Sequence, residues 1–221
     1  MNIAMIPARM GSQRLKRKNL RQLAGAPLIT HAIRKCLAVG LFDQVWVNSE
    51  HVDFGKIARS EGVDFHRRPE HLGANQTTSE EYIAEFLHNH ECDYLFQVHS
   101  IAPLLSVEEI RRFVESTLDC DCDVMLGCEP IQIECAFKGK PVNFSFSQKT
   151  NSQDLKPVQR ICWSISSWRR ETYLEAISHG QCATYTGKVC FHPLNCFASH
   201  VIKTEQDLRI AEALLPLVEG A

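Results

Sequence analysis

The order of apolar runs along the first third of the chain constrains its fold more than any other feature of the sequence. Residues 2–6 form a short apolar run of the kind that makes a buried strand. Helical spacing follows over 28–37, then a second buried strand within 42–49, a helical segment over 53–62 and a short strand from residue 63. Strands that alternate with helices through short links form a parallel sheet with right-handed crossovers. The sequence therefore predicts an α/β fold with a mostly parallel central sheet.

The same alternation continues through most of the chain. Apolar spacing indicates further helices at residues 80–88, 107–118, 170–178 and 204–217, and further strands at 94–98, 123–128, 157–168 and 186–191. Thr204, followed three residues later by Asp207, has nearly the spacing and chemistry of a capping box at the start of the last helix. A chain of 221 residues has the length of one domain, so we expect a single domain over residues 1–221.

Residues 130–156 depart from this alternation. Apolar and polar residues alternate over residues 142–147, which is typical of an antiparallel hairpin. This stretch includes Phe144 and Phe146, and exposed aromatic residues on such an arm mark either a lid or an interface. We expect a hairpin arm at residues 130–156 that contributes to a homodimer.

Charge and hydropathy exclude several classes of protein. The 24 Lys and Arg residues nearly balance the 26 Asp and Glu residues, which argues against nonspecific nucleic-acid binding. No apolar run approaches the ~20 residues of a membrane helix, and the N-terminus enters a strand without a signal-peptide pattern. We therefore expect a cytoplasmic protein with no nucleic-acid or membrane partner. The ten cysteines include no Cys-x-x-Cys pair, so zinc-ribbon spacing is absent.

The loop that follows the first strand is strongly basic. Its five cations are interleaved with small residues: Arg9, Gly11, Ser12, Arg14, Lys16, Arg17, Lys18 and Asn19. Gly11 allows a sharp turn or a close approach of a ligand to the backbone. Backbone N–H groups and cationic side chains together bind polyphosphates, and open α/β sheets bind ligands at the carboxyl ends of their strands. We favour a polyphosphate site over a merely solvated face. The loop lacks the Gly-Lys-Ser/Thr of a Walker A motif and the Gly-x-Gly-x-x-Gly of a dinucleotide fingerprint.

The opening segment also resembles a known family. The run Ile6-Pro7-Ala8-Arg9-x-Gly11-Ser12-x-Arg14-Leu15-x-x-Lys18-Asn19-Leu20, with Leu23-x-Gly25-x-Pro27-Leu28-Ile29 after it, is similar to the opening of the acylneuraminate cytidylyltransferases, the CMP-sialic acid synthetases and their relatives. Arg68-Pro69-x-x-Leu72 and Thr204-Glu205-x-Asp207-Leu208 continue the similarity, which becomes thinner after Leu105.

The resemblance implies a Rossmann-like, GT-A-type nucleotidyltransferase that joins CTP to a sialic-acid-like 3-deoxy-ulosonic acid, usually with Mg²⁺, and releases pyrophosphate. By matching position, Arg9 and Lys18 would hold the phosphates during catalysis. The nucleotide would be bound by Ala8, Gly11, Ser12, Asn19, Arg68, Ser79 and Gln97. Arg160, with Gln159 beside it, would bind the sugar acid, because a guanidinium grips a carboxylate at two points. From the residues alone, Ser79 equally suits a helix N-cap and Arg160 equally suits a surface cation.

Three departures from the family pattern bear on the site. The family's Asp-x-Asp-Thr, whose carboxylates bind the metal, is Val201-Ile202-Lys203-Thr204 here, so the metal ligands are unknown. Either Lys203 supplies part of the metal's charge, or the metal is carried in by the phosphates of CTP. The family's Asn-Gly-Ala is replaced by Cys162-Trp163-Ser164, and Gln13 replaces a base. The alternatives are another nucleotide such as GTP, another acceptor, or a catalytically silent nucleotide-binding subunit.

Overall fold

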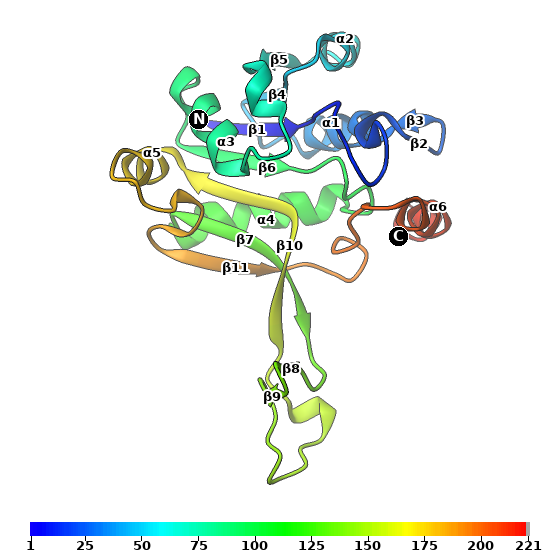
Figure 1. The fold of residues 1–221 in the computed structure, drawn as a ribbon, viewed down its shortest axis with the longest axis vertical. Helices are drawn as coiled ribbons and strands as arrows, with labels where there is room; N and C mark the ends of the chain where they lie inside the picture. The colour runs from blue at the N-terminus through cyan, green and yellow to red at the C-terminus, as the bar shows by residue number, and fades with distance from the viewer. Residues whose placement is uncertain (220–221) are drawn as a thin grey trace.

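A seven-stranded sheet forms the centre of the molecule (Figure 1). The structure is a computed structural model and describes residues 1–219. The strands of the sheet, in spatial order, are β11 (Val189–Pro193), β7 (Val124–Ile131), β10 (Val158–Arg169), β6 (Tyr94–Val98), β1 (Asn2–Pro7), β4 (Gln44–Ser49) and β5 (Asp64–Arg67). Only β10 runs antiparallel to its neighbours among these strands. The predicted α/β fold with a mostly parallel sheet is confirmed.

Helices cover both faces of the sheet. One face packs against α1 (Leu28–Val39), α2 (Val52–Ser60) and α4 (Val107–Cys120), and the other against α3 (Ser79–Asn89) and α5 (Arg170–Ser178). The last helix, α6 (Glu205–Glu219), packs against the opening loop and α1. Four short 3₁₀ helices and two small hairpins complete the described elements: η1 (Lys18–Leu20), η2 (Glu70–Gly73), η3 (Ser152–Asp154), η4 (Ala183–Tyr185), β2 (Gln22–Leu23) with β3 (Ala26–Pro27), and β8 (Ala136–Phe137) with β9 (Lys140–Pro141).

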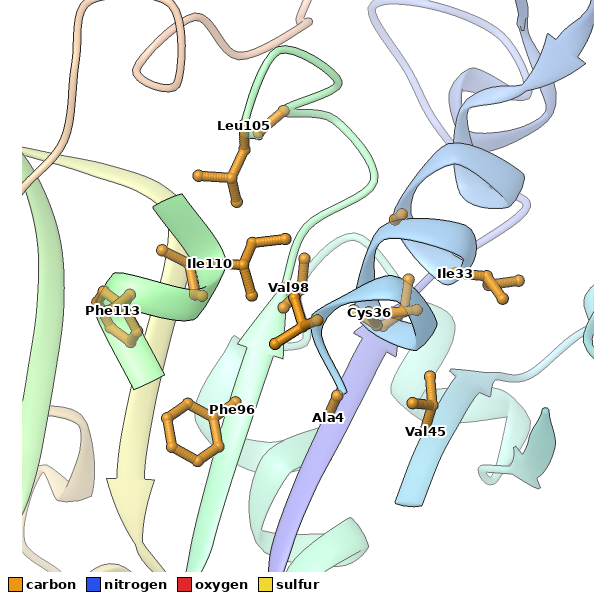
Figure 2. Close-up of a cluster of buried hydrophobic side chains, with 14 of the residues drawn as sticks. Ala4, Ile33, Cys36, Val45, Phe96, Val98, Leu105, Ile110 and Phe113 are labelled. Atoms are coloured by element: carbon orange, nitrogen blue, oxygen red, sulfur yellow. The ribbon is translucent and has the colours of Figure 1, made fainter. Parts of the chain in front are cut away.

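Strand β1 shows how the sequence builds the two cores. Its side chains alternate across the sheet, so Ala4 and Ile6 join the cluster under α1, while Ile3 and Met5 join the cluster under α3. All four are fully buried, which explains why this run is continuously apolar rather than alternating. Figure 2 shows the first cluster, in which side chains from α1 and α4 meet those of β1, β4 and β6.

A third cluster anchors the chain around the opening loop. Leu15 from the loop packs with Leu28 of α1, Ile202 and residues of α6 such as Leu208. Leu15 is only 6% exposed although its neighbours in the loop are charged. One buried leucine therefore fixes the middle of a basic loop against the end of the chain.

Two local features differ from the sequence-based interpretations, one of them the alternative role of Ser79. Thr78, not Ser79, caps α3: its hydroxyl accepts from the Glu81 N–H, and the Glu81 carboxylate accepts from the Thr78 N–H. The expected strand at 142–147 is not formed, because Asn143 instead bonds three backbone groups, at Cys135, Ile133 and Lys156. The hairpin of this arm lies at β8 and β9, and the arm extends well away from the body (Figure 1).

The expected capping box at the start of α6 is present, with an aspartate at its third position. The Asp207 carboxylate accepts from the backbone N–H of both Lys203 and Thr204, and the Thr204 hydroxyl accepts from the Asp207 N–H. Over residues 1–219, no helix is both long enough and apolar enough to cross a membrane.

Removing a buried side chain from α1 tests this packing. Ile33 is fully buried, so Ile33→Ala should lower the free energy of unfolding by about 2–5 kcal/mol through lost contacts and a cavity. Leu37, one turn further along the same helix and 46% exposed, is the matched control, and Leu37→Ala should change stability by no more than about 0.5 kcal/mol. Urea denaturation followed by circular dichroism measures both. Equal effects would contradict the assigned orientation of α1.

Candidate functional site

The opening loop leaves the carboxyl end of β1 and is tied to the strand beside it. The Ala8 N–H donates to the Asn48 carbonyl, which prolongs the β1–β4 pairing, and the Met10 N–H donates to the Glu50 carboxylate at 2.8 Å. Arg17 takes the left-handed backbone conformation, with φ 50°, immediately before η1. This turn directs the chain into η1, so that Lys18 and Asn19 return toward the start of the loop.

A cavity of about 330 Å³ lies against this loop. It opens at the carboxyl ends of β1 and β6, where the chain switches from one side of β1 to the other, as expected for an open α/β sheet. Its wall is made by four segments: residues of the opening loop, of the 68–82 segment, of the turn after β6 and of the turn before α6. The predicted location of the site therefore coincides with a cavity.

Most of the predicted nucleotide-site residues line this cavity together. They are Ala8, Arg9, Ser12, Lys18, Asn19, Arg68 and Ser79. Ser79 is free for this role because Thr78 takes the capping position. Gly11 does not line the cavity; a Cβ there would meet no protein atom within 4 Å and its φ is not left-handed, so packing does not require glycine at this position. The approach of a ligand to the Gly11 backbone stays a prediction.

Asn19 acts as a clamp on the loop. It is only 5% exposed, its amide Nδ2 donates to the Arg9 carbonyl, and its Oδ1 accepts from the Ser100 hydroxyl. These two bonds link the two ends of the loop to the turn after β6. Arg9 itself donates to the Ala74 carbonyl, which brings its charge across to the opposite wall of the cavity.

Arg68 is a second clamp, almost completely buried. Its guanidinium donates to the Ala8 carbonyl at 2.9 Å and to the Glu50 carboxylate at 3.0 Å, and its cationic group lies 4.8 Å from the centre of the Tyr82 ring. Burial lowers the pKa of Arg68, while the Glu50 carboxylate opposes that shift. Since its Nη2 donates both to the loop carbonyl and to the Glu50 carboxylate, Arg68 positions the loop as well as lining the cavity.

Gln97 lies behind the cavity wall rather than in it. It is fully buried; its amide Nε2 donates to the Tyr82 hydroxyl and its Oε1 contacts His99 Nε2 at 3.0 Å. Burial, and then the charge of Lys18, lower the pKa of His99 to about 4, so its ring is neutral at pH 7. With Oε1 as the acceptor, His99 carries its proton on Nε2 and presents Nδ1 as an acceptor. Gln97 thus orients two cavity residues, His99 and Tyr82.

Positive charge dominates the cavity. Its lining includes five cations, Arg9, Arg14, Lys18, Arg68 and Lys203, and no aspartate or glutamate. Burial, followed by the charges of Arg14 and Arg9, lowers the pKa of Lys18 to about 8. Lys203 acts on Lys18 in the same direction. Like charges gathered on one wall repel one another, so the cavity is suited to a multiply charged anion.

The donor set of the cavity does not fit a resident Mg²⁺ ion. Magnesium prefers carboxylate and water oxygens, and the lining offers cations and amides instead. Asp207, the acid that faces Lys18 from α6, already accepts three hydrogen bonds from Lys203 and Thr204. Over the described part of the chain, no cluster of three or more His, Cys, Asp or Glu side chains is arranged to hold a metal.

The two predicted acceptor residues lie elsewhere on this chain. Gln159 and Arg160 are exposed on β10, opposite Pro130 and Glu129 of β7. The Arg160 guanidinium is paired with the Glu129 carboxylate and also donates to the Ser199 hydroxyl. Neither residue lines the cavity. Arg160 forms a surface ion pair, which agrees with its alternative interpretation as a surface cation.

A backbone irregularity separates these residues from the cavity. The register of β10 against β7 shifts between Ile161 and Ser166, and Trp163 within the shift has φ 56°. A left-handed conformation is unusual for so bulky a residue. This is the position at which the resembling family has glycine. The Trp163 ring packs near Tyr185, with ring centroids 6.5 Å apart.

The cavity also contains residues that the sequence did not assign to the site. They are Asn75, Thr77, Tyr82, His99 and Ile101. Arg14, one of the expected loop cations, and Gln13 line it as well. His99 directly follows β6, and a residue at the carboxyl end of a central parallel strand is the signal by which it could have been found.

Comparisons with known proteins agree with this geometry. Residues 3–176 match the family model described as cytidylyltransferase. The chain is 28% identical over 193 residues to the N-acylneuraminate cytidylyltransferase of Streptococcus agalactiae serotype III (strain NEM316), covering 83% of this chain and 47% of that protein. It is 31% identical over 167 residues to the pseudaminic acid cytidylyltransferase of Campylobacter jejuni subsp. jejuni serotype O:2 (strain ATCC 700819 / NCTC 11168), covering 70% of this chain and 72% of that protein.

The chain spans about a quarter to a half of the length of the N-acylneuraminate cytidylyltransferases that it matches. Among solved structures, CMP:2-keto-3-deoxy-manno-octonic acid synthetase complexed with CTP has a TM-score of 0.72, with 17% identity and 98% of each chain covered. The 4-diphosphocytidyl-2C-methyl-D-erythritol synthase of Anaerococcus prevotii DSM 20548 has a TM-score of 0.70 at 11% identity, with 97% of each chain covered. The match over residues 3–176 decides the assignment: this chain belongs to the cytidylyltransferase family.

Proposed function

We propose that this protein joins CTP to a sialic-acid-like 3-deoxy-ulosonic acid and releases pyrophosphate. The observation that carries the proposal is the cavity at the carboxyl ends of β1 and β6, lined by five cations and no carboxylate. A triphosphate supplies the negative charge that such a lining needs. Membership of the cytidylyltransferase family supports CTP as the nucleotide, and the relatives' names support a nonulosonic acid as the acceptor.

The reaction transfers a cytidylyl group. The anomeric hydroxyl oxygen of the sugar acid forms a bond to the α-phosphorus of CTP, and the bond from that phosphorus to the bridging oxygen breaks. Pyrophosphate leaves with the electron pair, and the hydroxyl proton passes to solvent. Catalysis of this kind consists mainly of positioning and charge stabilisation.

The cavity residues divide these tasks. Arg9 and Lys18 neutralise the phosphates, Ser12 offers a hydroxyl beside them, and the clamp residues Asn19 and Arg68 hold the loop in shape. The Tyr82 hydroxyl accepts from Gln97, so its own proton is available to a ligand, whereas neutral His99 offers an acceptor. The lining thus presents both donors and acceptors to the uncharged part of a nucleotide.

On the acceptor side, we retain Arg160 and Gln159 as candidates for the sugar carboxylate. In this single chain Arg160 is paired with Glu129, so a substrate carboxylate would have to exchange with that pair. A guanidinium can bind a substrate carboxylate with charge-assisted, two-point geometry, so the exchange would replace one carboxylate with another. Mg²⁺, which the resemblance implies, would enter with the phosphates of the nucleotide, because the lining provides it with no carboxylate.

A second function, a nucleotide-binding subunit without catalysis, is favoured by the same lack of carboxylates in the lining. Pyrophosphate release separates the two. We expect release with Mg²⁺ present when CTP is combined with one acid from a panel of nonulosonic and octulosonic acids. Release with GTP, UTP or ATP but not with CTP would overturn the choice of nucleotide. Tight CTP binding without release across the panel would favour the silent subunit.

Loss of either loop cation should weaken nucleotide binding. Arg9→Ala and Lys18→Ala should each reduce CTP affinity at least tenfold, about 1.4 kcal/mol, because each removes a positive charge from the cavity wall. Lys16→Ala is the control, since Lys16 belongs to the same loop but does not line the cavity. Isothermal titration calorimetry measures all three. Unchanged affinity in both cavity variants would refute the loop assignment.

Nucleotide binding should also depend on pH through Lys18. The pKa of Lys18 is lowered to about 8, so the free protein loses this charge as the pH rises through that value. Between pH 7.5 and pH 9.5, CTP affinity should fall by up to about tenfold, with proton uptake on binding, since the bound phosphates favour the charged amine. Lys18→Arg stays charged over this range and should flatten the profile. A wild-type profile as flat as that of Lys18→Arg would contradict the role of Lys18.

We further propose that the arm joins two copies of the chain in a homodimer. Several of its large apolar side chains are exposed, including Ile133 at 59%, Phe137 at 67% and Phe146 at 75%. Burying them against a second copy removes this apolar surface from water. Sedimentation velocity should show a dimer for the wild type and a monomer for Phe137→Ser/Phe146→Ser. Leu37→Ser, at an exposed position on α1, should remain dimeric. A wild-type monomer at micromolar concentration would rule out the interface.

A further inference from the structure

The turn before α6 places one more cation at the cavity, on a segment that the loop motif does not include. Lys203 lines the cavity together with Arg9, Arg14 and Lys18. Its charge is among those that lower the pKa of Lys18, so the two amines are electrostatically coupled. Lys18 comes from η1 and Lys203 from the other end of the chain, so the fold itself brings them together.

The position of Lys203 is fixed by its backbone rather than by an ion pair. The neighbouring Ile202 is fully buried in the cluster that also contains Leu15 of the loop, and its N–H donates to the carbonyl of Ile101, another cavity residue. The Lys203 N–H donates to the Asp207 carboxylate of the α6 capping box. These contacts hold the backbone of Lys203 beside the opening loop and leave its exposed side chain unconstrained.

Within residues 1–219, the cations Arg14, Lys18 and Lys203 have no carboxylate within salt-bridge distance. Asp207 is the acid whose charge acts on Lys18, and its Oδ2 accepts three hydrogen bonds from the capping box. Cations that the protein leaves uncompensated beside one cavity are available to compensate an anion that enters it. Their number also removes the need for a divalent cation held by the protein at this place.

We propose that Lys203 binds the polyphosphate of the substrate opposite Lys18, and that this pair neutralises the phosphates without a protein-held metal ion. This inference deepens the proposed function and rests on the polyphosphate site assigned there. The Lys203 amine is a point charge on a flexible side chain, so it can move to match the position of the negative charge on a triphosphate. It would hold the β- and γ-phosphates in place and stabilise pyrophosphate as it leaves.

The test measures binding of a probe without base or ribose, inorganic tripolyphosphate, by isothermal titration calorimetry in EDTA. The wild type should bind the probe under these conditions. Lys203→Gln should weaken binding at least tenfold, because it removes one of the charges that face the phosphates. Lys16→Gln, at an exposed loop lysine outside the lining, should change binding by less than about twofold, as expected for a solvent-exposed, screened charge. Equal melting temperatures of the three proteins would establish that folding is unaffected.

A charge swap separates Lys203 from a metal effect. Lys203→Asp should lose tripolyphosphate binding in EDTA and regain part of it when Mg²⁺ is added, since a carboxylate at this place can share a metal with phosphates. The wild type should respond much less to Mg²⁺. Two results would overturn the inference: wild-type affinity in Lys203→Gln, or tripolyphosphate binding by the wild type that disappears in EDTA.

The same measurements keep this inference distinct from the proposed function. Lys203-dependent binding of tripolyphosphate with no preference for CTP over other nucleotides, and no pyrophosphate release, would support the role of Lys203 and overturn the proposed cytidylyl transfer. CTP-dependent pyrophosphate release by Lys203→Gln at the wild-type KM and kcat would support the proposed cytidylyl transfer and overturn the role of Lys203.

Discussion

The buried ion pair between Arg68 and Glu50 is the interaction on which the site depends. The Arg68 side chain is 2% exposed, yet it binds both the Glu50 carboxylate and the Ala8 carbonyl, while Glu50 also accepts from the Met10 N–H. The pair therefore holds the first residues of the opening loop to the carboxyl end of β4. Removing one partner of such a pair typically costs about 3–5 kcal/mol, because the other charge stays buried without compensation. A rigid loop base follows from this arrangement.

Rigidity is required because the loop presents repelling charges. Arg9, Arg14 and Lys18 face one cavity together with Lys203, and a flexible loop would relax by moving them apart into solvent. Leu15 in the hydrophobic cluster below α6, Asn19 between Arg9 and Ser100, and Arg68 at the loop base each oppose that relaxation. The lowered pKa of Lys18 reflects first its burial and then the positive charges of Arg14 and Arg9 beside it. The free protein thus holds a cluster of positive charges that a bound anion would neutralise.

The sequence predicted the sheet and the place of the basic loop at its carboxyl edge because both depend on local patterns. Apolar runs such as residues 2–6 specify buried strands, and a loop at the end of a buried strand has few places to lie. Gln97 could not be assigned correctly in this way, because its role depends on Tyr82 and His99, which meet only in the fold. Ser79 failed as a cap for a related reason: Thr78 offers the same chemistry one residue earlier.

The surroundings of Arg160 could not be predicted from local pattern, and their geometry indicates why. Arg160 lies at the base of the arm, and its partner Glu129 comes from β7, so its surroundings are set by strand pairing over a long sequence separation. Trp163, in the register shift that follows, adopts a backbone conformation that its bulk disfavours. Strain of this kind persists only where surrounding contacts enforce it, and here Ser164 is buried, with its hydroxyl bonded to the Ala198 carbonyl. The bulge is therefore held by the segment that leads to Lys203, which links the register shift of β10 to the basic cavity.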